Sequence, residues 1–149
     1  MTEAMLQYFH AWYNKELFNN ELEPAMICVK NTGGELPEIQ AEFIRVTEPF
    51  VIRFNIDVPE EEETEADTIY YLTVLLHEMV HQYCEENDID DTLDGEHMEA
   101  FEEEAENRGL IQGGYRLSNE IKEKVIEQVE CYKEWRKAVI DFSNHQGEN

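Results

Sequence analysis

The order of hydrophobic and polar positions predicts a helix followed by three short strands in the first 56 residues. Residues 3–19 have apolar side chains at helical spacing, and this pattern ends near Asn19-Asn20. Three runs rich in Val, Ile and Phe follow at Ala25–Val29, Ile39–Val46 and Phe50–Ile56. The third run alternates apolar and polar residues, which is typical of a strand with one buried face. Short connections, including the turn-forming Asn31–Gly34, favour a small antiparallel or mixed sheet.

A long helix is predicted next, over residues 65–86. The acidic stretch before it, from Pro59 onward, is interpreted as a solvated loop. Thr64 followed three residues later by Asp67 resembles a capping box, and acidic residues suit the first turn of a helix. Because this segment is apolar over most of its circumference, we expect the helix to be buried.

Two further helices are predicted in the last third of the chain. A polar loop over residues 87–96 precedes a helix from His97 to Arg108, which Gly109 ends at the position expected of a helix terminator. Gly113-Gly114 marks a hinge, and Ser118 begins a long helix to about Phe142. Its apolar stripe has a spacing close to that of a packing seam and consists of Ile121, Val125, Tyr132, Trp135, Val139 and Phe142.

These elements predict an α+β fold with an N-terminal helix, a small three-stranded sheet, a buried helix, a second shorter helix and a long C-terminal helix. No repeat or linker interrupts the pattern, and 149 residues are enough for one ordinary core. We therefore interpret residues 1–149 as a single domain, in which the helix over 118–142 packs on a main body.

The net charge of −24 limits the classes of partner. A strongly negative surface repels nucleic acid and anionic lipid, because binding to phosphates depends on Lys and Arg. Solubility is the simplest explanation of this charge, and attraction of a basic substrate or partner is the alternative. Direct binding to nucleic acid or to a membrane is not expected, and nothing in the sequence defines an oligomeric state.

The three cysteines and the N-terminal segment favour a cytoplasmic location. Cys28, Cys84 and Cys131 are far apart in sequence and odd in number, which argues for reduced thiols. The N-terminus has no basic segment followed by an apolar one, so no signal peptide is expected. The longest nearly apolar run, residues 69–76, is too short to span a bilayer.

The motif His77-Glu78-Met79-Val80-His81 lies within the predicted buried helix and indicates a metal site. Two histidines four residues apart lie about 40° apart around a helix and roughly 6 Å apart along it, so both imidazoles can bind one ion. In this motif the glutamate beside the first histidine acts on a metal-bound water. Polar side chains on a buried helix also need partners. We therefore predict one Zn²⁺ per chain, with Glu78 as a catalytic base.

A catalytic zinc site needs a third protein ligand, and His97 is the best candidate. The polar loop before His97 is long enough to fold back on the helix that contains the motif, and a neutral imidazole suits zinc. Asp94, Glu96 and Glu102 are competing carboxylate ligands. Cys84 shares the face of His77 and His81, but it is about 10.5 Å along the helix from His77, which is too far to share one ion.

Two other metal motifs fit poorly. In the metzincin pattern the glycine would fall at Cys84 and the third histidine at Asn87. A calcium loop aligned on Gly95 would require glutamate where Phe101 stands. A more plausible role for one of the acids Asp88, Asp90, Asp91 and Asp94 is to hold a zinc-binding histidine through its other ring nitrogen.

Over roughly residues 5–111 the sequence resembles the SprT-like (Spartan-type) zincin metalloproteases. The similarity lies in the segments 12–19, 77–83, 94–101 and 108–110, with Met98 in place of the glycine that usually follows the third ligand of that family. The resemblance implies a zincin-like fold, zinc bound by His77, His81 and His97, and Glu78 as general base. Three separated cysteines cannot form the zinc ribbon that some bacterial members of that family contain. With its negative net charge, the chain also shows none of the basic DNA-binding segments of the eukaryotic members.

We therefore expect a zinc-dependent peptidase in which Glu78 takes a proton from water and passes it to the leaving amine. In zincins an edge strand aligns the peptide, and Phe50–Ile56 and Ile39–Val46 are the two candidates. Tyr70, Tyr83 and Tyr115 are equal candidates for stabilising the oxyanion. The acidic surface suggests a preference for basic peptides. The alternative function is a zinc-stabilised protein-binding module without significant catalytic activity.

Overall fold

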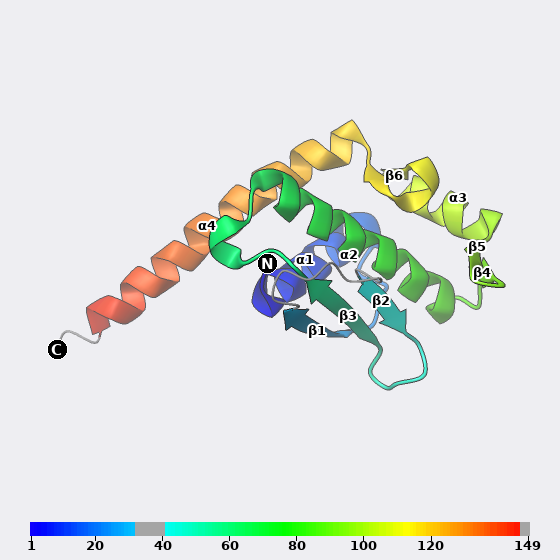
Figure 1. Cartoon of the computed structure of the whole chain (residues 1–149), viewed down its shortest axis with the longest axis horizontal. Coiled ribbons are helices and arrows are strands. Elements are labelled where there is room, and N and C mark those ends of the chain that lie inside the picture. Colours follow the sequence, from blue (N-terminus) through cyan, green and yellow to red (C-terminus); the bar gives the residue numbers. More distant parts are fainter. Residues whose placement is uncertain (32–40, 147–149) are drawn as a thin grey trace.

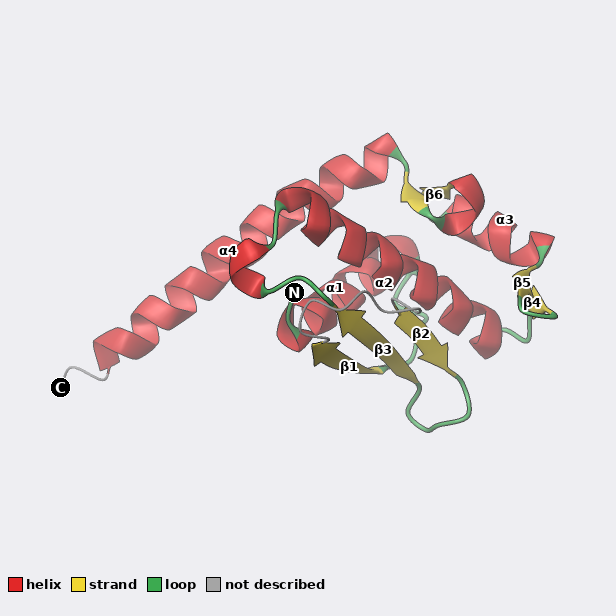
Figure 2. Ribbon diagram, in the orientation of Figure 1, coloured by secondary structure: helices red, strands yellow, loops and turns green. Residues whose placement is uncertain are grey.

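The computed structural model describes residues 1–31 and 41–146 and has a mixed α+β architecture in this part of the chain (Figure 1). The four α-helices are α1 (Glu3–Leu17), α2 (Glu65–Glu86), α3 (Glu99–Asn107) and α4 (Asn119–Gln146). A three-stranded sheet lies beside α2, and two hairpins of two-residue strands flank α3 (Figure 2). The predicted combination of helices, a small sheet and a long C-terminal helix is confirmed.

The sheet is mixed, with strand order β1-β3-β2. The strand β3 (Val51–Ile56) is central; it pairs in parallel with β1 (Met26–Asn31) and antiparallel with β2 (Ala41–Ile44). The predicted alternation is confirmed, since Ile52, Phe54 and Ile56 are all buried. Of the predicted segments, residues 32–34 of the turn and residues 39–40 of the second strand lie outside the described residues.

Helix α1 packs against α2 through an aromatic face. The Thr2 hydroxyl oxygen caps α1 by accepting a hydrogen bond from the Met5 N–H. Phe9 and Tyr13 are fully buried, and the Tyr13 hydroxyl donates to the Leu72 carbonyl of α2. As expected, the helix ends before Asn19, which with Asn20 adopts a left-handed backbone conformation with φ of 54° and 59°.

Helix α2 has the predicted bounds and forms the centre of the molecule. Its start is a complete capping box, in which Thr64 and Asp67 each accept from the other's backbone N–H. Nearly all of its residues from Tyr71 to Gln82 are buried, between α1 on one side and β2 on the other. Because α2 is packed in this way, its backbone is held rigidly, and the positions of its polar side chains are fixed as well.

The segment containing His97 differs from the prediction. Helix α3 begins at Glu99, whereas His97 belongs to the short strand β5 (Glu96–His97), which pairs with β4 (Thr92–Leu93). The turn between these strands has positive φ at Asp94 and Gly95, which closes a tight hairpin. The predicted helix start at His97 is therefore wrong, because backbone pairing with Thr92 holds His97 in an extended conformation.

The predicted packing seam of α4 is present in only the first half of that helix. Val125 and Tyr132 are buried, as the seam predicts. Trp135, Val139 and Phe142 are 58%, 45% and 63% exposed, because this part of α4 extends beyond the body (Figure 1). Trp135 has ring contacts with Tyr8 and Tyr132, but within the described ranges none of Trp135, Val139 and Phe142 belongs to the hydrophobic core or packs against it. The seam prediction is wrong for this second half.

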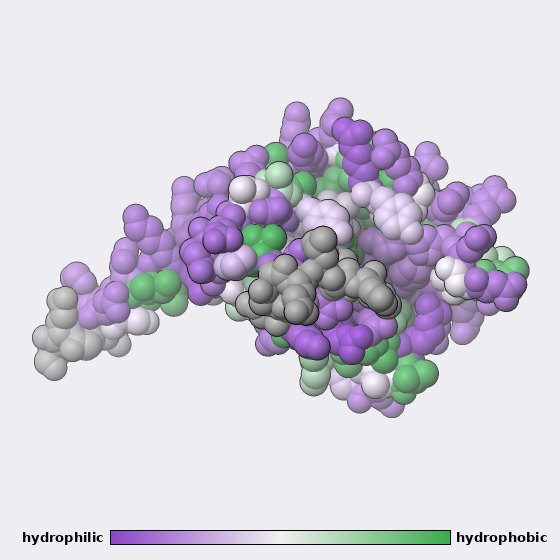
Figure 3. All heavy atoms as spheres, viewed as in Figure 1, coloured by the Kyte–Doolittle hydropathy of each residue, from purple (hydrophilic) through white to green (hydrophobic). Residues whose placement is uncertain are grey.

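The visible face of the molecule is predominantly hydrophilic, in keeping with the acidic composition (Figure 3). Within the described ranges no helix combines the length and the apolar character needed to cross a bilayer.

Two glycines with the same backbone conformation allow the cost of packing to be separated from the cost of strain. Gly109 follows α3 with φ of +86°, and a Cβ there would overlap the Ile121 side chain of α4. Gly95 has φ of +81° with open space around it. We expect Gly95→Ala to lower the free energy of unfolding by about 1 kcal/mol and Gly109→Ala by about 3 kcal/mol. Urea titrations of both variants would measure this difference, and equal losses would contradict the packing role of Gly109.

Candidate metal centre

Helix α2 places three polar side chains of the predicted motif together at its buried face. His77, Glu78 and His81 are only 8%, 8% and 7% exposed. The two histidines lie one helical turn apart, and their ring centroids are separated by 5.1 Å. Because α2 is packed on two sides, their positions are set by the core of the protein rather than by a surface loop.

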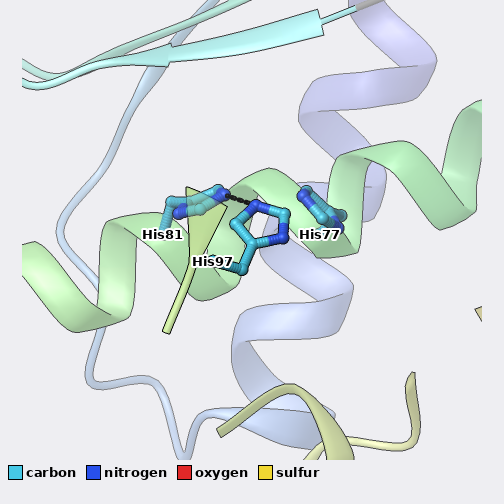
Figure 4. Close-up of side chains that lie close together, drawn as sticks. All are labelled: His77, His81 and His97. Carbon is cyan, nitrogen blue, oxygen red and sulfur yellow. Dashed lines mark hydrogen bonds between the residues drawn. The ribbon is translucent and has the colours of Figure 1, made fainter. Parts of the chain in front are cut away.

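The hairpin β4–β5 brings His97 to the same place (Figure 4). One ring nitrogen from each of His77, His81 and His97 lies within 4.8 Å of the others, and Nε2 of His81 is 3.2 Å from Nε2 of His97. Ligand nitrogens around a tetrahedral zinc ion are about 3.3 Å apart, as follows from a metal–nitrogen distance of about 2.05 Å. This cluster therefore has a size that suits one transition-metal ion with only a small inward movement.

The hydrogen bonds behind the rings determine which nitrogens face the cluster as acceptors. Nδ1 of His77 lies 2.8 Å from the Gly114 carbonyl oxygen, and Nδ1 of His81 lies 2.6 Å from a carboxylate oxygen of Asp91. A carbonyl and a carboxylate can only accept, so both Nδ1 atoms carry the proton and both Nε2 atoms present a lone pair. Two fixed lone pairs that converge beside a third imidazole form a donor set that fits a cation.

Aromatic rings hold the imidazoles in place. The fully buried Phe101 of α3 stacks on His81 and on His97, with ring centroids 4.3 Å and 4.2 Å apart. Tyr115 stacks on His77, with ring centroids 4.9 Å apart. Among the described residues, the cluster of possible ligands consists of the three histidines alone, so Asp94, Glu96, Glu102 and Cys84 are not part of it.

Asp91 and Gly114 both accept hydrogen bonds from the histidines, but only Asp91 was predictable from the sequence. Asp91 is one of the four acids that we expected to hold a histidine by its second nitrogen, and the geometry selects it. Gly114 was expected only as a hinge. It has φ of +94°, and a Cβ would come within 3.0 Å of Phe101 and 3.3 Å of Nδ1 of His77. The only signal in the sequence was the Gly-Gly pair, which does not identify a partner.

Glu78 lies beside the cluster in an environment that disfavours its charge. Burial raises the pKa of Glu78 to about 8, although a hydrogen bond from the Phe43 backbone N–H lowers it. The negative charges of Glu42 and Asp91 also contribute to this raised value, and Arg45 opposes them. The carboxyl group of Glu78 is therefore held close to a protonation equilibrium at neutral pH.

The titration of the supporting groups is consistent with a cation-binding arrangement. The pKa of His77 is lowered to about 4, chiefly by burial and in smaller part by the neighbouring imidazoles, while the hydrogen bond to the Gly114 carbonyl opposes this shift. Burial also lowers the pKa of His81 and of His97, so all three rings are neutral at pH 7. Burial raises the pKa of Asp91, but hydrogen bonds from Arg45 and His81 outweigh this effect and leave it below its usual range.

The histidines and Glu78 lie at an open cleft of about 530 Å³ between α2 and the sheet. Strand β2, an edge strand of the sheet, forms one wall with Ala41, Glu42 and Phe43. Of the three tyrosines considered for the oxyanion, Tyr70 and Tyr115 line the cleft. Tyr83 instead contacts the ring of Phe18 in a tilted arrangement and is covered by the guanidinium of Arg108.

No family model matches this chain, and neither a curated protein nor a solved structure matches it. The chemistry of the site is therefore inferred from its own geometry.

The donor set predicts which metal ions stabilise the protein. Imidazole ligands favour ions such as Zn²⁺ and Co²⁺ over Mg²⁺ and Ca²⁺. At a concentration 100 times its dissociation constant, such an ion should add about 2.7 kcal/mol to the free energy of unfolding. We expect His97→Ala to lose most of this gain and His145→Ala, at an exposed site on α4, to retain it. Thermal melts with each ion would test this, and an equal gain in both variants would rule out the cluster as the binding site.

The raised pKa of Glu78 predicts how stability of the metal-free protein depends on pH. Between pH 4.5 and 8 the folded protein retains a proton on Glu78 that the unfolded chain releases, so this group lowers stability as the pH rises. We expect Glu78→Gln to raise the free energy of unfolding at pH 9 by at least about 1 kcal/mol, the value of one pKa unit. The gain should disappear toward pH 4.5.

Urea titrations in a chelator at pH 5, 7 and 9 would measure this effect. Glu106→Gln, which removes the same charge from an exposed position of α3, is the matched control. A gain that is equal in the two variants, or that does not change with pH, would show that burial does not destabilise the Glu78 carboxylate.

Proposed function

We propose that this protein is a zinc-dependent peptidase with a zincin-like fold, of the SprT-like (Spartan-type) class that its sequence resembles. The observation that supports this most strongly is the convergence of His77, His81 and His97 beside the buried Glu78 at the floor of a cleft. Three imidazoles with an open fourth position are a typical donor set of a catalytic zinc site, whereas structural zinc sites are closed by four protein ligands. Zinc held by these nitrogens would supply a Lewis acid and would lower the pKa of a water molecule in the cleft.

Glu78 has the position and the environment of a general base. Its carboxylate accepts from the Phe43 N–H, which orients one side of the group and leaves the remaining lone pairs for water in the cleft. Glu78 takes the proton of the attacking water and then delivers it to the leaving amine. The pKa of about 8 belongs to the metal-free site, and a bound dication would lower it and leave Glu78 ionised, as a base requires.

Strand β2 is suited to align a peptide substrate. Of the two candidate strands, β3 is central and paired on both sides, whereas β2 pairs, among the residues that the structure describes, with β3 alone. Phe43 donates its N–H to Glu78 and therefore faces away from β3, and the carbonyl of an extended residue points to the same side as its N–H. An extended peptide can add to this edge through the outward-facing carbonyl of Phe43, whose N–H is already bonded to Glu78, and this contact places its scissile bond near Glu78.

The charge of the protein supports a basic peptide or protein as the substrate. The cleft wall includes both Glu42 and Arg45, each of which is in an ion pair, and the negative field comes from the whole chain, which has a net charge of −24. A field of this sign attracts cationic segments and repels the phosphates of nucleic acids. We therefore propose cleavage of proteins or peptides without direct contact to DNA.

The decisive experiment measures zinc content and proteolysis in the same preparations. We expect the wild-type protein to bind one zinc and to cleave casein or a basic peptide, and Glu78→Gln to bind zinc equally while losing at least about 100-fold in rate, a typical loss for general acid–base catalysis. Glu106→Gln should behave like wild type. Matched peptides that differ only in charge, at low and high salt, test the preference for basic substrates.

The other outcomes separate the alternatives. Zinc binding with no cleavage of any tested protein would favour the zinc-stabilised binding module. Retained cleavage in Glu78→Gln would reject the assigned base, and absence of zinc from the wild-type protein would reject both functions.

A further inference from the structure

Arg45 connects the edge of the sheet to the histidine cluster, and it has no part in the proton transfer described above. It directly follows Ile44, the last residue of β2, and it lines the cleft. Its guanidinium donates from Nη1 to Oδ1 of Asp91 at 3.3 Å and from Nη2 to Oδ2 at 3.1 Å. Nη1 also donates to Glu85 of α2 at 3.0 Å. One side chain therefore joins β2, α2 and the segment before β4.

Asp91 in turn contacts both segments that carry the histidines, α2 and the segment of β5. Its Oδ2 atom accepts from Nδ1 of His81 at 2.6 Å, and its backbone carbonyl accepts from the Met98 N–H at 2.8 Å, next to His97. Asp91 is only 2% exposed, so its carboxylate depends on protein groups rather than on water. The orientation of His81 therefore depends on the orientation of one buried carboxylate.

An ordinary surface ion pair would be the simplest alternative explanation for Arg45. The sheet contains such a pair, in which Arg53 contacts Glu42 and both side chains are substantially exposed, at 48% and 37%. The contact of Arg45 with Asp91 differs in two respects, because the carboxylate is buried and the guanidinium makes two parallel hydrogen bonds to it. A planar fork of this kind fixes the carboxylate in one orientation, which a single charge does not do.

We propose that Arg45 is a positioning residue of the metal centre. It holds the Asp91 carboxylate in one rotamer, and this carboxylate directs Nε2 of His81 toward the ion. Because Arg45 follows β2 directly, it also ties the strand that aligns the substrate to the residues that bind the metal. The effect on the metal rests on the hydrogen bonds alone, whereas the link to substrate alignment rests on the proposed peptidase function.

The test compares zinc affinities, measured by competition with a chromophoric chelator, in matched variants. We expect Asp91→Asn to weaken zinc binding by about 10- to 100-fold and Arg45→Gln by about tenfold, since groups behind the ligands affect metal affinity by such factors. Arg45→Lys should recover only part of the loss, because lysine keeps the charge without the fork. Arg53→Gln removes the same charge from the same sheet and should change the affinity by less than about twofold.

A double-mutant cycle shows whether Arg45 acts through Asp91. If it does, Arg45→Gln should have little further effect in the Asp91→Asn background, because the group that it positions is already altered. Independent, additive losses would overturn the proposal, and so would equal zinc affinities of Arg45→Gln and Arg53→Gln. If Arg45→Gln does not fold, Arg45→Lys decides the question, since wild-type affinity in that variant would show that the fork is not needed.

The same measurements separate this proposal from the proposed function. A wild-type protein that binds zinc but cleaves nothing would reject the peptidase, while the affinities of the variants would still decide the role of Arg45. For an active wild-type protein, Arg45→Gln assayed at saturating zinc should raise KM more than it lowers kcat, as expected if β2 is less well aligned. A wild-type protein that binds no zinc would overturn both proposals.

Discussion

The arrangement of the site depends on which ring nitrogen carries the proton in two buried imidazoles, those of His77 and His81. Gly114 and Asp91 accept from the Nδ1 atoms of His77 and His81, and this leaves both Nε2 lone pairs directed at the same point. Without these acceptors either ring could expose an N–H instead, and two N–H groups would repel a cation. The β4–β5 hairpin supplies the third imidazole, from His97, and the residue directly before it, Asp91, supplies one acceptor. The turn that contains Gly114 supplies the other acceptor.

Such an arrangement lowers the stability of the fold on which it is built. Glu78 and three imidazoles lie at or below the surface, where burial disfavours their charged forms. The surrounding core offsets this cost, since α2 is packed by α1 and the sheet along most of the segment that contains the site. Buried polar groups that are not needed for packing and that face a cleft are a recurrent property of functional sites.

Much of the fold was predictable because its signals are local. The capping box of α2 involves residues three positions apart, and the alternation in β3 and the spacing of His77 and His81 follow directly from backbone geometry. The extended conformation of His97 was not predictable, because it depends on backbone pairing with Thr92. The exposure of Trp135 was also missed, since a helical stripe has the same spacing whether or not a partner covers it.

The sequence by itself determined the buried helix and the proximity of His77, Glu78 and His81, because these three residues lie close together on one helix. Only the tertiary structure decided that His97 and not a carboxylate completes the cluster, and that Asp91 and Gly114 orient the rings. The hydrogen bond of His77 spans 37 positions and that of Arg45 to Asp91 spans 46. Contacts at such separations leave no periodicity in the sequence, because they depend on how the sheet, α2 and the two hairpins pack together.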